Sequence, residues 1–407
     1  MRQIAGFEVC LKTSISKPLL LMRQKGFQFF PQQSMLKLRA IALASCTLML
    51  LLLCIAKEGQ AQVVLGKYAG EFLAFGVGAR PLGMGGVASA LVQDVTAGYW
   101  NPAGLSKINY PQVALMHAQS FGNVVNYNYG AVAIPFEENK SLGISVMRLG
   151  VSDIPDTRGA WDEARNRPID NAENLITRFN AADWAVLVSY AVATPYKFSY
   201  GLNAKFILRH IGDFANAWGI GVDAGVIYDV GSGFTLGISV QDITTTFISW
   251  TTGRNELITP TAKLGGGYLL DALYGRFTLG FDTDIRFEGR KSTAHLAFGA
   301  VSLNFRGGLE YSYKNIVAVR AGIDDIGRLT LGAGLRIAKL NIDYSFARFD
   351  SIEQLGNSHR ISLQLELDQE SFRRKGYVPP PEETPPDKPK SDEPKPDEPK
   401  PEPENHQ

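Results

Sequence analysis

The chain has little cysteine, and all of it lies near the N-terminus. Its three cysteines are Cys10, Cys46 and Cys54, so none follows Ala61. A structural disulfide, a thiolate metal site and a cysteine nucleophile are therefore excluded from residues 62–407. Neither sign of charge is in excess, because 41 basic residues face 40 acidic ones and the formal net charge is +1. This balance does not favour a nucleic-acid partner.

Motifs of enzymatic chemistry are also missing. The glycine-rich stretch from Gly78 to Leu105 lacks the G-x-G-x-x-G spacing, because Pro81 stands in the third-glycine position after Gly76 and Gly78. No G-x-x-x-x-G-K-[ST], H-E-x-x-H or G-x-S-x-G motif occurs. Asp282 and Asp284 lie two apart on one strand face, but arginines on the same face favour structural ion pairing over acid–base chemistry. We predict a non-enzyme with no metal or cofactor.

The sequence has a single long apolar run, which lies close to the N-terminus. Lys37 and Arg39 precede the apolar residues 41–56, and Gly59-Gln60-Ala61 forms a small-x-small cleavage site. This order is typical of a secretory signal peptide that starts at Met35, and it makes residues 1–34 an over-long start. Leu43-Ala44-Ser45-Cys46 also matches a lipoprotein signal, but Cys46 lies near the start of the run and not after it.

What the chain has in abundance is period-two alternation. Ile361, Leu363 and Leu365, for example, alternate with polar residues, and such a pattern predicts strands with one apolar and one polar face. Fourteen segments follow this pattern: 112–120, 126–135, 141–149, 181–192, 198–210, 216–229, 234–244, 260–270, 274–287, 303–313, 317–324, 329–338, 340–349 and 359–367.

The lengths of these segments separate two all-β architectures. Strands of a soluble sandwich run about five or six residues, whereas about 9–11 residues cross a bilayer as a tilted strand. Short connections follow the even-numbered segments, and the long ones, 150–180, 245–259 and 288–302, follow odd-numbered segments. This asymmetry is typical of outer-membrane barrels. We therefore predict an all-β, transmembrane antiparallel β-barrel of about 14 strands in the outer membrane of a diderm bacterium, surrounded by outer-membrane lipid.

Alternation also assigns charged side chains to the lumen, where they can pair with one another, with water or with a plug. The predicted lumen charges are Arg276, Asp282, Asp284, Arg286, Arg306, Glu310, Arg320, Asp324, Arg336 and Asp343.

The glycine-rich stretch precedes the first strand, in the position of a plug. Its glycines permit tight turns and close backbone approach, and its polar residues offer anchoring points. We predict an N-terminal hatch over residues 62–110; if this hatch is a gate, we expect Asp94 and Asn101 to hold it by binding inward-facing arginines. The candidate hatch or gate residues are Gly78, Arg80, Gly83, Met84, Gly85, Asp94, Asn101, Pro102 and Gly104.

The C-terminal end differs in kind. From Tyr377 it reads VPPPEETPPDKPKSDEPKPDEPKPEPENHQ, a composition that stays extended and disordered. The predicted domains are residues 1–61 for the start and signal peptide, 62–110 for the hatch, 111–370 for the barrel and 371–407 for a disordered periplasmic tail. The tail is a solvated linker or binds peptidoglycan or a periplasmic protein, and the sequence leaves both open.

The segments G-A-R-P-L-G-M-G-G and D-V-T-A-G-Y-W-N-P-A-G-L resemble the N-terminal signature of the PorV/PorQ family of outer-membrane proteins. That family is related to the FadL-like barrels, which share an N-P-A-G-like turn in their hatch. The resemblance covers roughly residues 70–370 and implies a fourteen-stranded barrel with a hatch. It further implies an accessory role in protein export or surface attachment of the type IX kind, in which external loops 150–180 and 245–259 hold cargo or a translocon barrel.

The alternative is a FadL-like, hatch-gated transporter of hydrophobic small molecules. A structural barrel tethered by its tail is a third possibility.

Overall fold

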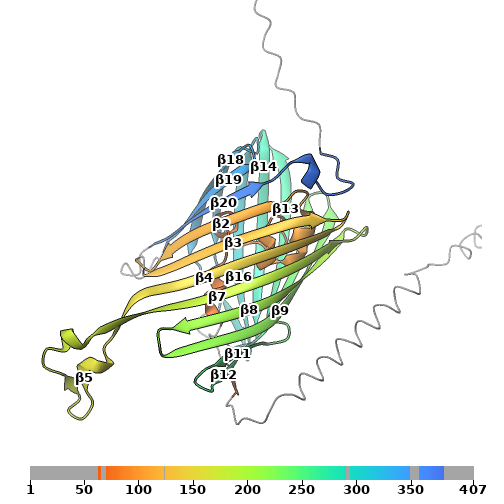
Figure 1. The fold of residues 1–407 in the computed structure, drawn as a ribbon. Helices are drawn as coiled ribbons and strands as arrows, with labels where there is room; N and C mark the ends of the chain where they lie inside the picture. The colour runs from red at the N-terminus through yellow and green to blue at the C-terminus, as the bar shows by residue number, and fades with distance from the viewer. Residues whose placement is uncertain (1–62, 66–69, 123, 290–293, 349–356, 380–407) are drawn as a thin grey trace, which may run out of the picture. The chain divides into compact units, whose positions relative to one another are not determined.

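The computed structural model describes residues 63–65, 70–122, 124–289, 294–348 and 357–379 (Figure 1). The predicted signal peptide, the alternative lipid site at Cys46 and the tail from residue 380 onward lie outside the described residues.

Fourteen antiparallel strands close into a barrel, as predicted. Each strand pairs with its neighbour along the chain, and the sheet closes where β20 pairs with β2, with Glu366 opposite Gln112. The strands are β2 (Gln112–Ser120), β3 (Val125–Phe136), β4 (Lys140–Asp156), β7 (Thr177–Ala193), β8 (Phe198–Ile211), β9 (Ala215–Gly231), β10 (Phe234–Gln241), β13 (Thr261–Ala272), β14 (Gly275–Arg286), β16 (Val301–Tyr313), β17 (Val317–Ile323), β18 (Leu329–Ile337), β19 (Leu340–Ala347) and β20 (Ser358–Glu366).

The outer face of the barrel is apolar because alternate side chains point outward. In β8, Phe206 and Leu208 are 50% and 58% exposed, whereas Lys205, which directly precedes Phe206, is 3% exposed. Ile238 and Val319 repeat this outward exposure on other strands. A closed sheet with an apolar exterior satisfies every backbone group internally and presents hydrocarbon to lipid. The barrel is therefore built to span a membrane.

The two ends of the barrel differ in their connections. One end, here called the turn end, has tight turns such as 137–139 and 338–339. The other, the loop end, carries the longer excursions. These are the two-stranded β5 (Trp161–Asp162) and β6 (Arg167–Pro168), the hairpin of β11 (Thr246–Trp250) and β12 (Asn255–Ile258), and β15 (Leu296–Phe298). β1 (Val63–Leu65) pairs in parallel with β12.

The β10 strand is shorter than predicted. It ends at Gln241, and the chain resumes β structure in β11. β11 pairs with residues 217–220 of β9, nearer the loop end, whereas β10 pairs with residues 224–231 of β9, nearer the turn end. Asp242 and Thr245, at the two ends of this break, have φ values of 58° and 60°. The predicted loop 245–259 is consequently a hairpin that continues the barrel wall. Among the described residues, no helix has the length and apolarity required to cross a bilayer.

Candidate functional site: the hatch inside the barrel

Residues 70–110 fill the lumen as short helical turns. They form η1 (Glu71–Phe75), α2 (Ala79–Gly83), α3 (Ala97–Trp100) and η2 (Pro102–Lys107). Val77 and Leu105 are fully buried, and Trp100 is 3% exposed. The hatch therefore packs as a solid core against the barrel wall.

Glycines on the inward face of the wall make room for the hatch backbone. A Cβ at Gly225 would lie 2.0 Å from Asn101 Oδ1, and one at Gly237 would lie 2.0 Å from the carbonyl oxygen of Ser89. At Gly308 the same atom would lie 2.3 Å from the carbonyl oxygen of Met84. A glycine inside a strand often marks such close approach of another backbone, and this signal was present in the sequence but not used for prediction.

The hatch glycines serve the turn around Met84. Gly85 has φ of 72°, and its amide donates to Thr330 Oγ1 at 2.9 Å. A Cβ at Gly85 would lie 2.4 Å from the carbonyl oxygen of Ile323, and one at Gly83 would lie 3.0 Å from Gly332 Cα. Gly78 also has a positive φ, 78°. Position 85 therefore requires glycine, because both its backbone conformation and its contact with the wall exclude a side chain.

Asn101 lies at the start of η2 and is fully buried. Its Oδ1 accepts from the amide of Ala103 at 3.2 Å, and its Nδ2 donates to the carbonyl of Ser89 at 2.7 Å. Longer bonds of 3.3 Å reach the carbonyls of Val226 and Ile238 in the wall. Pro102 follows at the first helical position, which suits its fixed φ. Gly104 is required as well, since its Cβ would lie 2.2 Å from the carbonyl oxygen of Val92.

Among the described residues, neither Asp94 nor Asn101 makes a hydrogen bond or an ion pair with an arginine, in contrast to the prediction. Asp94 Oδ1 accepts from the amide and hydroxyl of Thr96 at 2.8 and 2.6 Å, and Asn101 donates to backbone carbonyls. The charged contacts between hatch and wall run the other way, with the acidic groups on the wall and the donors on the hatch. Arg80 of the hatch binds an acidic residue of the wall, and Asp282 of the wall binds hatch donors.

Asp282 holds the middle of the hatch. Its Oδ2 accepts from the amides of Ala88 and Ser89, both at 2.9 Å, and from Ser89 Oγ at 2.8 Å. The side chain is 1% exposed. Removing it would leave three buried donors without an acceptor, which is costly in a dry interior.

Arg80 joins the hatch to an inner charge cluster made of Arg80, Glu310, Arg320 and Asp343. Arg80 donates to both carboxylate oxygens of Glu310, with Nε and Nη2 at 2.9 and 2.8 Å. Arg320 donates to Glu310 at 2.5 Å and to Asp343 at 2.7 Å. Two cations and two anions balance, so the cluster compensates its own burial.

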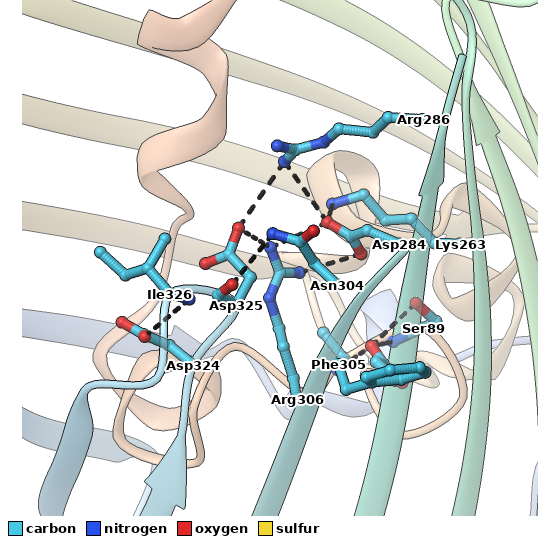
Figure 2. Close-up of polar contacts among 12 residues, drawn as sticks. Ser89, Lys263, Asp284, Arg286, Asn304, Phe305, Arg306, Asp324, Asp325 and Ile326 are labelled. Atoms are coloured by element: carbon cyan, nitrogen blue, oxygen red, sulfur yellow. Dashed lines mark hydrogen bonds and ion pairs between the residues drawn. The ribbon is translucent and has the colours of Figure 1, made fainter. Parts of the chain in front are cut away.

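An outer charge cluster lies nearer the loop end and is made of Lys263, Asp284, Arg286, Arg306 and Asp325. Figure 2 shows its contacts. Arg306 contacts Asp284 at 2.9 Å and Asp325 at 3.0 Å. Arg286 lies 3.5 Å from Asp284, and Lys263 lies 3.8 Å from it. Lys263 also stands 5.5 Å from the ring centre of Trp100 in the hatch. The predicted pairing of Arg286 with the aspartates of its strand is confirmed for Asp284.

Three other predicted lumen charges contact neither cluster. Arg276 pairs with Asp271 at the turn end, where both are exposed. Asp324 pairs with Arg328 at 2.7 Å in the loop between β17 and β18. Arg336 lines the cavity at the turn end.

Toward the loop end the lumen is apolar on one side, although the alternation predicts polar side chains in the lumen. Tyr127, Met147 and Ile207 point inward from β3, β4 and β8 and are at most 2% exposed. Two rings of η1 pack there. Phe72 is 5% exposed, and Phe75 stacks on Tyr127 with ring centres 5.6 Å apart and an interplanar angle of 27°. The hatch thus occupies an apolar half-chamber with its own aromatic rings.

Two cavities lie on opposite sides of the hatch. A small one of about 60 Å³ borders Glu71, Tyr99 and Trp100 near the loop end. A large one of about 1290 Å³ is bordered by Arg80 and Asp94 and by the ends of the strands at the turn end. They share no lining residue. Within the described part of the chain, no group of three or more histidine, cysteine or acidic residues could hold a metal ion.

A membrane-spanning barrel closed by an internal hatch is the class that this geometry defines. No family model and no curated protein matches the chain. Among solved structures, it is similar to the Pseudomonas putida toluene transporter TodX, with 11% identity over 72% of this chain and 98% of that chain and a TM-score of 0.50. The Ralstonia pickettii toluene transporter TbuX (14% identity, 72% and 98% coverage) and a Pseudomonas aeruginosa FadL homologue (12%, 71% and 98%) have TM-scores of 0.49 and 0.46. The chain shares the overall fold of TodX.

Proposed function

We propose that this protein is a hatch-gated transporter of small hydrophobic molecules in the outer membrane. The observation that carries the proposal is the apolar half-chamber at the loop end, which Phe72 and Phe75 fill with two aromatic rings. A chamber that accepts aromatic side chains offers similar contacts to a small aromatic or aliphatic ligand. The similarity to the toluene transporter TodX supports the same substrate class.

The hatch is the gate in this proposal. The loop end faces the outside and the turn end faces the periplasm, which is the usual orientation of such barrels. A ligand that displaces η1 reaches the outer side of the hatch, and the hatch must then shift to give access to the large polar cavity below. Asp282, Asn101 and the Arg80–Glu310 pair hold the hatch closed. Neither chemistry nor a cofactor is needed.

Binding of toluene to the purified barrel tests the proposal. Phe75→Ala removes the ring that stacks on Tyr127 and leaves space for a ligand, so toluene affinity measured by calorimetry rises. Phe281→Ala is the matched control, because Phe281 is 53% exposed on the lipid-facing surface. Equal toluene binding by the parent chain and both variants would refute the assignment of the chamber.

A second candidate is an accessory role in protein export, and the external hairpin favours it. β4 and β7 extend toward a loop in which Trp161 and Leu175 are 45% and 43% exposed. Exposed large apolar side chains clear of the lipid-facing wall are typical of a protein contact. Native mass spectrometry of the mildly extracted protein separates the two candidates: bound small hydrophobic molecules favour transport, and a stoichiometric protein partner lost on deletion of residues 157–176 favours export.

A further inference from the structure

The segment after β20 folds back against the junction between hatch and barrel. The amide of Leu367 donates to the carbonyl of Pro111 at 2.8 Å, and the amide of Arg374 donates to that of Asn109 at 2.8 Å. The Tyr377 ring packs edge-on against Tyr110, with ring centres 5.9 Å apart. Residues 367–377 therefore follow the stretch that joins η2 to β2, although more than 250 residues separate them in sequence.

Arg374 is the centre of this contact. The residue is 7% exposed. On the hatch side, its Nε and Nη2 donate to the carbonyl of Ile108 at 2.9 and 2.6 Å, and Nη2 donates to the carbonyl of Ser106 at 3.2 Å. These carbonyls belong to the C-terminal end of η2, where backbone acceptors have no partner inside the helix.

The same guanidinium also binds the barrel. Nη1 donates to the carbonyls of Glu138 and Lys140 at 3.3 and 3.2 Å, and Nη2 donates to Ser141 Oγ at 2.8 Å. All of these atoms lie in or beside the turn between β3 and β4. One side chain thus connects the C-terminal segment, the end of the hatch and the barrel wall.

The acceptors around Arg374 are unusual for a buried arginine. Among the described residues, no carboxylate lies within ion-pair distance of it, so carbonyl and hydroxyl dipoles alone compensate its charge. A planar group with five fixed donors can satisfy several carbonyls at once, which neither lysine nor alanine can do. Burial lowers the pKa of Arg374 below its ordinary value.

From this geometry we propose that residues 367–378 form a latch that holds the hatch closed at the turn end, with Arg374 as its positioning residue. Loss of the guanidinium frees the end of η2 from the barrel turn and lets the lower part of the hatch open locally. The latch is independent of what the barrel carries.

Cysteine accessibility tests the latch directly, because residues 62–407 contain no native cysteine. Ser106 is 5% exposed, and its Oγ has no hydrogen-bond partner among the described residues, so Ser106→Cys is a mild reporter. In the parent carrying this reporter, maleimide labelling in mild detergent is slow. Arg374→Ala accelerates it at least about tenfold, as expected when local opening becomes easier by the loss of several charged hydrogen bonds.

Arg373→Ala is the matched control, since among the described residues the Arg373 side chain pairs only with the exposed Glu370, at 3.5 Å. It leaves the labelling rate unchanged. Heat-dependent mobility on gels verifies that each barrel is folded, and Arg374→Lys, which keeps the charge, gives an intermediate rate if the alanine variant does not fold. Unchanged labelling in Arg374→Ala, or equal acceleration in Arg373→Ala, would overturn the proposal. So would acceleration in a chain ended after Pro379, which retains the latch. None of these readouts measures transport, so the result is separate from the proposed function.

Discussion

The replacement of Gly308 by alanine is the sharpest test of how the hatch is held in the lumen. The new Cβ would lie 2.3 Å from the carbonyl oxygen of Met84, whereas an ordinary contact begins at 3.4 Å, so a displacement of 3.4 − 2.3 = 1.1 Å is required. Backbone lies on both sides of the contact, and no rotamer change can relieve it. Overpacking of this kind costs about 2 kcal/mol, which raises the population of a displaced hatch roughly thirtyfold.

The neighbouring glycine supplies the control. A Cβ at Gly307 would meet no heavy atom within 4 Å, so Gly307→Ala changes the same strand by the same methyl group without touching the hatch. Val87 is 1% exposed in the hatch, and Val87→Cys serves as the reporter in a maleimide labelling assay. We expect roughly thirtyfold faster labelling in Gly308→Ala and no change in Gly307→Ala. Similar rates in the two variants would show that close backbone approach does not hold the hatch.

Three further results are expected. Asp282→Ala leaves the three donors from Ala88 and Ser89 unpaired, costs roughly 2–3 kcal/mol, and accelerates Val87→Cys labelling; an unchanged rate would contradict the role of this carboxylate. Arg80→Met removes the two hydrogen bonds to Glu310, so we expect its single-channel conductance in planar bilayers to exceed that of the parent. An unchanged conductance would show that Arg80 does not hold the hatch closed. Phe75→Ala increases toluene affinity by calorimetry, and a decrease would mean that the Phe75 ring contributes to the ligand site and does not occlude it.

The strand arrangement could be predicted because the bilayer imposes a simple rule on each strand. In the membrane, one face must be apolar, and the alternation of Leu363 with Gln364 in β20 expresses this directly. The two-residue turns at the turn end leave little freedom for register. The closed fourteen-stranded barrel confirms this reasoning.

The rule fails toward the loop end of β3, where the inward side chains are apolar and the outward ones are polar. At the loop end of β3, Tyr127 and Tyr129 are buried in the lumen, while Asn126 and Asn128 face outward. His117 on β2 bonds Asn128 on that outer surface at 2.8 Å. The interior at this level therefore resembles the core of a soluble protein. A prediction that equates inward with polar therefore misses the apolar half-chamber.

The hatch contacts could not be predicted for a different reason. Asp282 is 193 residues from Ser89, and Glu310 is 230 residues from Arg80, and a strand pattern does not say which level of the lumen meets which turn of the hatch. Arg374 falls in a stretch that composition assigns to the tail, yet its side chain is buried. Only the folded chain brings these residues together.

The glycine-lined wall has a consequence for biogenesis. Because inward-facing glycines of the wall fit the hatch backbone so closely, a barrel that closed empty would leave gaps along these glycines, and a preformed hatch would have to enter through one of its ends. The hatch directly precedes β2, whereas β20 is the last strand to be synthesised. We therefore expect the seam between these two strands to close around a hatch that already lies inside.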